Sequence, residues 1–432
     1  KKYFDKAKAM AAGMSERERL RLEIREKQLL ALEDIKDEGR FLAYTRAIDT
    51  ALAKNLEDPV FWILRGNAEE GNASGRGQRG TASSVAFYDA VLGLVPDHAS
   101  AHHYLVHSYE TIGRIDRALQ HGAQYARFSP AIPHASHMWG HDLRRVGKVD
   151  EAIAQFKRTD DIERAYYAAE KIDPAMDWHH AHNLDLLASC YQHKGQVKLT
   201  EKTLRESGSL AVLSAYRAFN QRELPTFLLH RGRFEEALKE ARTLTQSKFP
   251  QARAVGQALA GQALVALGRG DEAKAALAAA TRELEAVPAA TIGLDPTRAM
   301  VAPWVDALRG EMLLRAGSPK EAHEILKGVI KGLRTAPGPD AWSQGLFRLE
   351  LMAHAAVEAG DWEFADYVAG QMMEHDAAYG GSHYATALVH QHKGDKEAAL
   401  RALTEAKKYW KDADTDLPEL KTMTEVALRL EP

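Results

Sequence analysis

A glycine followed five residues later by a small residue recurs along this chain, and it constrains the fold more than any other feature of the sequence. Eight such pairs occur at intervals of 34 to 49 residues. The pairs are Gly113 with Ala118, Gly147 with Ala152, Gly195 with Thr200, Gly232 with Ala237, Gly268 with Ala273, Gly317 with Ala322, Gly360 with Ala365 and Gly394 with Ala399. Glycine relieves the turn after a helix by taking a positive φ, and a small side chain lets two helices cross closely. We therefore expect a series of antiparallel helix pairs.

The hydrophobic pattern between these turns is also helical. Most segments carry apolar residues at spacings of three and four, which is typical of amphipathic helices, and segments with strand character are nearly absent. Hydrophobic residues make up 45% of the chain and charged residues 27%, an ordinary globular composition. The sequence thus predicts an all-α fold.

The repeated segments resemble the tetratricopeptide repeat (TPR) family, whose helix–turn–helix unit has a period of 34 residues. The segment "IGRIDRALQHGAQYARFSP" at residues 112–130 carries the resemblance best. The segments "VGKVDEAIAQF", "RGRFEEALKEA", "LGRGDEAKAAL" and "KGDKEAALRAL" repeat the same theme. The resemblance covers about residues 97–408. It implies a right-handed superhelical solenoid of antiparallel helix pairs, with a concave groove that binds small molecules or peptides.

The departures from the repeat predict the domain organisation. Residues 1–56 are expected to form an N-terminal helical cap, residues 57–410 the repeat array and residues 411–432 a C-terminal capping helix, because the end units of a solenoid need a cover. Insertions are expected near residues 71–80, which are rich in glycine, and near residues 158–177, where the interval between turn glycines is long.

Charge and composition exclude several classes of function. The formal net charge is −3, so the chain has no overall basic field for nucleic acid. No apolar run approaches the roughly 20 residues that span a bilayer. Cys190 is the single cysteine, which excludes intrachain disulfides and zinc sites built from several cysteines. We expect a soluble protein, either cytoplasmic or exported after removal of a signal peptide.

The unusual chemistry of the sequence lies in its histidines, which follow one helix face in three successive units. Positions thirteen, ten, six and three residues before each turn glycine share a face, while the positions between them are apolar and pack. That face is expected to line the concave groove. The first stripe holds His103, His107 and Glu110, the second His134, His137, His141 and Arg144, and the third His182, Asp185, Ser189 and Gln192.

Two HxxxH pairs on neighbouring helices predict a metal site. Side chains four residues apart on a helix have Cβ atoms about 5–6 Å apart, and packed helices lie about 8–10 Å apart. Imidazoles from both helices can therefore meet at one ion, or at two. Mixed imidazole and carboxylate ligands suit zinc, copper, iron or manganese. The predicted ligands are His103, His107, His137, His141 and Glu110.

The remaining stripe residues are expected around the metal. His134, His182, Asp185 and Arg144 are predicted to support the ligands or to bind a substrate. His121 is expected to face solvent.

Two functions fit the pattern: a TPR protein with a metal centre for binding or catalysis, and a metal-free adaptor that binds a peptide or protein segment in its groove. Polar residues concentrated at one end of the array favour the local metal site, and the sequence names no reaction.

Overall fold

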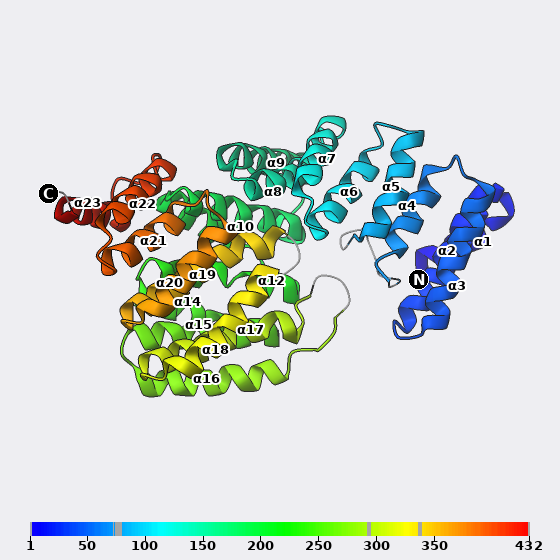
Figure 1. The fold of residues 1–432 in the computed structure, drawn as a ribbon. Helices are drawn as coiled ribbons and strands as arrows, with labels where there is room; N and C mark the ends of the chain where they lie inside the picture. The colour runs from blue at the N-terminus through cyan, green and yellow to red at the C-terminus, as the bar shows by residue number, and fades with distance from the viewer. Residues whose placement is uncertain (1, 72, 74–79, 292–294, 336–338, 431–432) are drawn as a thin grey trace. The chain divides into compact units, whose positions relative to one another are not determined.

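The computed structural model describes residues 2–71, 73, 80–291, 295–335 and 339–430 (Figure 1). Their regular elements are helices α1 to α23 and two short 3-10 helices, so the predicted all-α fold is confirmed. The chain divides into two compact units, Lys1–Asp142 and Leu143–Pro432, which are described separately below. This division does not coincide with the boundaries expected after residues 56 and 410.

The first unit begins with α1 and ends within α8. Its helices are α1 (Lys2–Ala9), α2 (Glu16–Glu33), α3 (Glu38–Lys54), α4 (Pro59–Ala68), α5 (Ala82–Leu94), α6 (Ala99–Thr111), α7 (Ile115–Phe128) and α8 (Pro133–Arg145), with the 3-10 helix η1 at Ala11–Gly13. Helix α2 starts with a capping box in which Ser15 and Glu18 satisfy each other's backbone N–H groups. Helices α2 with α3, α4 with α5, and α6 with α7 form packed pairs.

The second unit contains the remaining pairs. Its helices are α9 (Val149–Glu170), α10 (Trp178–His193), α11 (Val197–Ser209), α12 (Ala215–Asn220), α13 (Glu223–His230), α14 (Phe234–Leu244), α15 (Pro250–Ala266), α16 (Gly270–Glu285), α17 (Arg298–Arg315), α18 (Pro319–Thr335), α19 (Pro339–Glu358), α20 (Trp362–His375), α21 (Gly380–His392), α22 (Lys396–Tyr409) and α23 (Pro418–Leu430), with η2 at Pro174–Met176.

The turn glycines do what the repeat predicted. All eight have φ between 67° and 77°, the left-handed region that a residue with a Cβ enters at a cost. After α6, Gly113 N–H donates to the Glu110 carbonyl at 3.2 Å, and Arg114 N–H donates to the Tyr109 carbonyl at 2.8 Å. This pair of bonds is a Schellman motif, which satisfies the last free carbonyls of the helix.

The small residues after each turn lie at helix crossings, as expected. All seven alanines are at most 1% exposed, and Thr200 is fully buried. A close approach of the same kind brings α7 against α8, where a Cβ on Gly122 would meet Asp142 Oδ2 at 2.7 Å. Each helix pair therefore packs closely at the small residue that follows its turn glycine, and this crossing leaves no room for a larger side chain.

The two expected insertions have different outcomes. Most of residues 71–80, namely 72 and 74–79, lies outside the described residues. Near residues 158–177 the extra length extends α9 to 22 residues, against 14 for α7. Lys171 ends α9 in a left-handed conformation with φ 55°, and η2 then leads to Asp177, which caps α10.

The end of the second unit returns to its first helices. Trp410 Nε1 donates to the His193 carbonyl at 3.2 Å, and Asp414 N–H donates to the Gly195 carbonyl at 3.1 Å. Lys194 adds an ion pair to Asp412 at 2.8 Å. The segment after α22 thus covers the turn after α10, and Figure 1 shows α22 beside α10 at this end of the second unit. Thirteen of the sixteen residues of α10 are buried.

Candidate metal centre

The centre of interest in the first unit is built on α6. His98 caps this helix, since its side chain accepts a hydrogen bond from Ala101 N–H at 3.2 Å. Leu105 and Val106 are fully buried and hold the apolar face of α6 against its neighbours. His103 and His107 lie one turn apart on another face, as the spacing predicted.

The third imidazole comes from the first turn of α8. Pro133 begins this helix, a position that suits proline because the first N–H groups of a helix have no partner within it. His134 follows directly, and its Nε2 lies 3.1 Å from His103 Nε2. His107 Nε2 also lies 3.1 Å from His103 Nε2. Three imidazole nitrogens therefore converge, and all three side chains are half-buried.

This geometry is unsuited to hydrogen bonding alone. Each nitrogen of a neutral imidazole carries either one proton or one lone pair. His103 Nε2 therefore makes at most one well-directed hydrogen bond, although it faces two other ring nitrogens at the same distance. Two imidazole nitrogens bound to one ion at about 2.0–2.1 Å lie about 3.0–3.4 Å apart. The spacing of His103, His107 and His134 matches that arrangement.

Glu110 lies beside this cluster on the same helix. Its side chain is 4% exposed, and neither carboxylate oxygen has a hydrogen-bond partner. Oε2 lies 3.6 Å from His107 Nδ1, on the ring edge away from the converging Nε2 atoms. Glu110 was expected as a ligand, but this position suits a carboxylate that orients His107 and keeps the Nε2 lone pair toward the centre.

Two tyrosine rings lie against His103. The ring of Tyr125 on α7 lies 5.2 Å from that of His103, and the ring of Tyr104 lies 4.9 Å from it. Burial raises the pKa of Tyr125 to about 12, so its hydroxyl stays protonated. Burial, and after it the charge of His107, lowers the pKa of His103 well below its usual value, so His103 is neutral near pH 7 and able to ligate.

The second predicted pair, His137 and His141, lies farther along α8. The two rings are 4.4 Å apart, and both residues are buried, at 1% and 5% exposure. Among the described residues of the first unit, the histidine that completes the group of His103 and His107 is His134, which was expected in a supporting position. The ring of His137 lies 5.8 Å from that of His134.

The expectation that His121 faces solvent is wrong. His121 Nδ1 lies 2.9 Å from His102 Nδ1, and its ring stacks on Tyr109 at 5.5 Å. Burial lowers the pKa of His121 to about 4. The prediction failed because α7 turns this side of its surface toward α6, a contact that the repeat pattern alone does not specify.

The other predicted residues lie in the second unit. Arg144, expected to bind an anionic substrate, is 1% exposed and pairs with Asp376 at 2.8 Å. Asp185 accepts a hydrogen bond from Ser207 at 2.6 Å. His182 Nδ1 lies 3.2 Å from the Tyr216 hydroxyl. The expected role of His182 and Asp185 beside the histidines of the first unit stays a prediction.

Comparisons with known proteins identify no family for this chain. No family model matches the chain, and no curated protein matches it. A tetratricopeptide repeat protein from Parabacteroides merdae is 14% identical over 60% of this chain and 92% of its own, with a TM-score of 0.41. A putative kinesin light chain with TPR-like repeats from Podosopora anserina is 18% identical over 44% of this chain and 95% of its own, with a TM-score of 0.37.

A third solved structure, a MamA RS-1 ArsTM double mutant, is 18% identical over 46% of this chain and 96% of its own, with a TM-score of 0.35. The chain has a TPR-like fold. At these identities and TM-scores the likeness carries no argument about function, so the histidine centre is judged on its own geometry.

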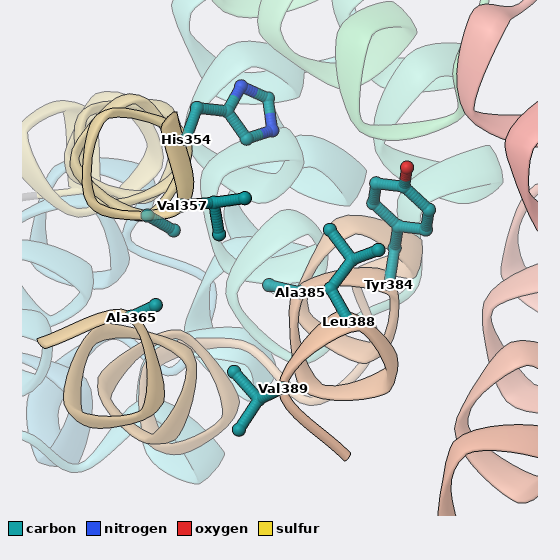
Figure 2. Close-up of a pocket in the computed structure, with 8 residues that line it drawn as sticks. His354, Val357, Ala365, Tyr384, Ala385, Leu388 and Val389 are labelled. Carbon is teal, nitrogen blue, oxygen red and sulfur yellow. The ribbon is translucent and has the colours of Figure 1, made fainter. Parts of the chain in front are cut away.

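A small pocket in the second unit is a weaker site. It lies between α19, α20 and α21, and its volume is about 250 Å³ including its open mouth. Its lining is apolar apart from His354 and Tyr384, whose polar ends Figure 2 shows on the same side of the pocket, above Val357 and Leu388. Among the described helices, none has the length and apolar character needed to cross a membrane.

Sequence reasoning missed two contributions to the centre. Tyr125 carries no motif that marks it, because its contact with His103 depends on how α7 packs on α6. His134 was on the predicted stripe, but it was placed outside the ligand set. The proline before it was the available signal, since it places His134 in the first turn of α8, one turn before His137.

Proposed function

We propose that this TPR-like protein binds a transition-metal ion through His103, His107 and His134, and that the bound ion serves ligand binding or catalysis. The observation that carries the proposal is the double contact of His103 Nε2, which lies 3.1 Å from each of the other two Nε2 atoms. A metal ion accommodates all three lone pairs at once, which hydrogen bonds among three neutral rings do not.

The kind of metal follows from the ligands. Three imidazoles without thiolate favour zinc, copper or iron over calcium or magnesium, which take oxygen ligands. Three protein ligands around tetrahedral zinc leave one position for water or a substrate group. A metal-bound water has a lowered pKa, which supports hydrolytic chemistry at neutral pH. The centre therefore suits an open, reactive site better than a closed structural one.

The surrounding residues support this role. A buried carboxylate without a hydrogen-bond partner has lost its hydration without replacement. A metal ion bound to His107 Nε2 would draw electron density from the ring and make Nδ1–H a stronger donor, which would stabilise the Glu110 carboxylate. The tyrosines beside His103 limit the access of water on one side of the centre. His137 lies within reach of a substrate or of a second ion bound along α8.

Metal analysis tests the proposal directly. The full-length protein, purified without a metal-affinity column, is dialysed against zinc and measured by elemental analysis and by calorimetric titration. We expect His103→Ala with His107→Ala to remove one equivalent of zinc and to leave the helical circular dichroism spectrum unchanged.

The matched control is His121→Ala. It alters another close pair of imidazoles in the same unit, His102 with His121, which no third candidate ligand joins among the described residues. We expect it to keep the full zinc content. Wild-type protein that binds no zinc, copper or iron at this centre would overturn the proposal and would favour the metal-free adaptor.

A further inference from the structure

A second group of charged side chains lies where the sequence breaks the repeat. The extra length of α9 carries Asp160 and Glu163, and the start of α10 carries His179 and His180. Glu163 is 1% exposed and His180 is 2% exposed. Burying a carboxylate is costly unless it is paired, so an insertion that adds a buried carboxylate at this point calls for an explanation beyond packing.

Glu163 is held between two imidazoles. His179 Nδ1 lies 2.5 Å from Oε1, and His180 Nδ1 lies 3.0 Å from Oε2. Burial by itself would raise the pKa of Glu163, but the hydrogen bonds from both histidines outweigh it, and the net shift is downward. One oxygen of Glu163 is thus fixed by His179, and the other is turned toward His180.

Asp160 brings a second carboxylate to the same place. Its Oδ2 accepts a hydrogen bond from Arg164 Nε at 2.8 Å, whereas its Oδ1 is buried without a hydrogen-bond partner. That free Oδ1 lies 3.6 Å from His180 Nδ1. Arg164 is shared with Glu206, at 2.6 Å, so its positive charge does not balance the carboxylates around it.

From this geometry we infer that Asp160, Glu163 and His180 form a second metal site, which binds a divalent ion such as manganese or zinc. The separations of 3.0 and 3.6 Å between His180 Nδ1 and the two carboxylate oxygens are close to those of adjacent ligands on one ion. Two carboxylates with one imidazole form a harder ligand set than three imidazoles, and such a set accepts manganese. The ion would also neutralise the excess negative charge.

Ligation requires the proton of neutral His180 to lie on Nε2. Without a metal, His180 Nδ1–H donates to Glu163, so ligation requires this proton to move to Nε2. No described residue donates a hydrogen bond to His180 Nε2 that would block this tautomer. The group of His230, Glu350 and His354 makes a useful contrast. There Arg231 donates to His230 Nδ1 at 2.7 Å, which holds the proton on Nε2, facing Glu350. With the proton on Nε2, His230 has no lone pair there for a metal ion.

Manganese binding to the full-length protein tests the inference, with free Mn²⁺ followed by electron paramagnetic resonance. We expect one equivalent to bind to the wild type and to the His103→Ala, His107→Ala double variant, because the two centres are independent. Asp160→Asn should weaken binding about 100-fold, whereas Asp161→Asn, an exposed neighbour on α9, should not change it.

The zinc content separates this inference from the proposed function. If the double histidine variant loses no zinc while Asp160→Asn loses one equivalent, the first centre fails and the second stands. Circular dichroism of each variant checks that it is folded, and His180→Ala provides a second removal of a ligand. Unchanged manganese and zinc binding in folded Asp160→Asn and His180→Ala would overturn the inference and leave the cluster as a link between α9 and α10.

Discussion

The buried ion pair between Arg144 and Asp376 gives the sharpest test of how the second unit is held together. The two side chains meet at 2.8 Å and are 1% and 5% exposed. The Arg144 guanidinium also lies 5.1 Å from the ring centre of Trp342. Asp376→Asn keeps the size of the side chain and an oxygen for the Ala378 N–H, but it removes the charge that neutralises Arg144. Breaking a buried pair in this way costs about 3–5 kcal/mol.

Urea unfolding followed by circular dichroism measures this cost. We expect the free energy of unfolding to fall by about 3–5 kcal/mol, and the melting temperature by roughly 6–20 °C, since a large domain loses about 2–4 °C per kcal/mol. The matched control is Asp366→Asn, which removes an exposed pair with Lys393 whose side chains are 51% and 49% exposed. Exposed pairs contribute about 0–1 kcal/mol, so the control should unfold nearly as the wild type does.

A double variant separates the lost attraction from the stranded charge. Arg144→Met combined with Asp376→Asn removes both charges and should be more stable than Asp376→Asn alone, because no ion is left unpaired in the interior. If Asp376→Asn costs no more than the surface control, or if the double variant is destabilised by the sum of the two single changes, the reasoning from burial is refuted.

Three further outcomes follow from the same contacts. Ala237→Leu should overpack a fully buried crossing and lower the free energy of unfolding by about 1–3 kcal/mol in urea titrations. Gly232→Ala should cost about 1–2 kcal/mol in the same assay, because no atom lies within 4 Å of the new Cβ and only the backbone at φ 67° resists it. Burial lowers the pKa of His193 to about 4, below an unfolded value near 6.5. The unfolded chain therefore binds the proton first as the pH falls, and the free energy of unfolding should decrease by about 2 kcal/mol between pH 7 and pH 5. His193→Gln should reduce that pH dependence, which denaturation at several pH values measures.

The fold was predictable because its determinants are local. A turn with positive φ and a crossing with no space both act within one helix pair, and both demand a particular residue type. Gly232 and Ala237 meet these demands five residues apart, and seven other pairs repeat them along the chain. Because this pair of residues recurs eight times, it predicts the helix pairs without any knowledge of long-range contacts.

The histidine cluster of the proposed metal centre was only partly predictable, because it depends on the axial offset between helices. Counting back from each turn glycine placed His103 level with His137, and His107 level with His141. In the first unit the group is completed by His134, one turn earlier on α8. A shift of three residues along a helix is about 4.5 Å, which is enough to exchange one imidazole for another. Register within a helix is visible in the sequence, but the axial offset between two helices is set by packing.

Contacts between distant repeats were not predictable at all. Arg144 and Asp376 are 232 residues apart, and each looks like an ordinary polar residue near the end of a helix. The bond from Trp410 to the His193 carbonyl likewise joins the start of the second unit to its end. A repeat pattern describes how each pair meets the next one, so it carries no sign that the chain returns on itself.

The contact at the other ring nitrogen separates the proposed ligand His107 from the structural His230. A carboxylate near Nδ1, as Glu110 is for His107, favours the proton on that side and leaves Nε2 free to bind an ion. A guanidinium at Nδ1, as Arg231 is for His230, forces the proton onto Nε2 and closes it. The position of a histidine on its helix face determines which other imidazoles it can approach. The contact at the far ring nitrogen determines whether the converging nitrogen carries a lone pair or a proton. The spacing of histidines therefore indicates candidate ligands, and a charged residue behind a ring, where one lies there, distinguishes among them.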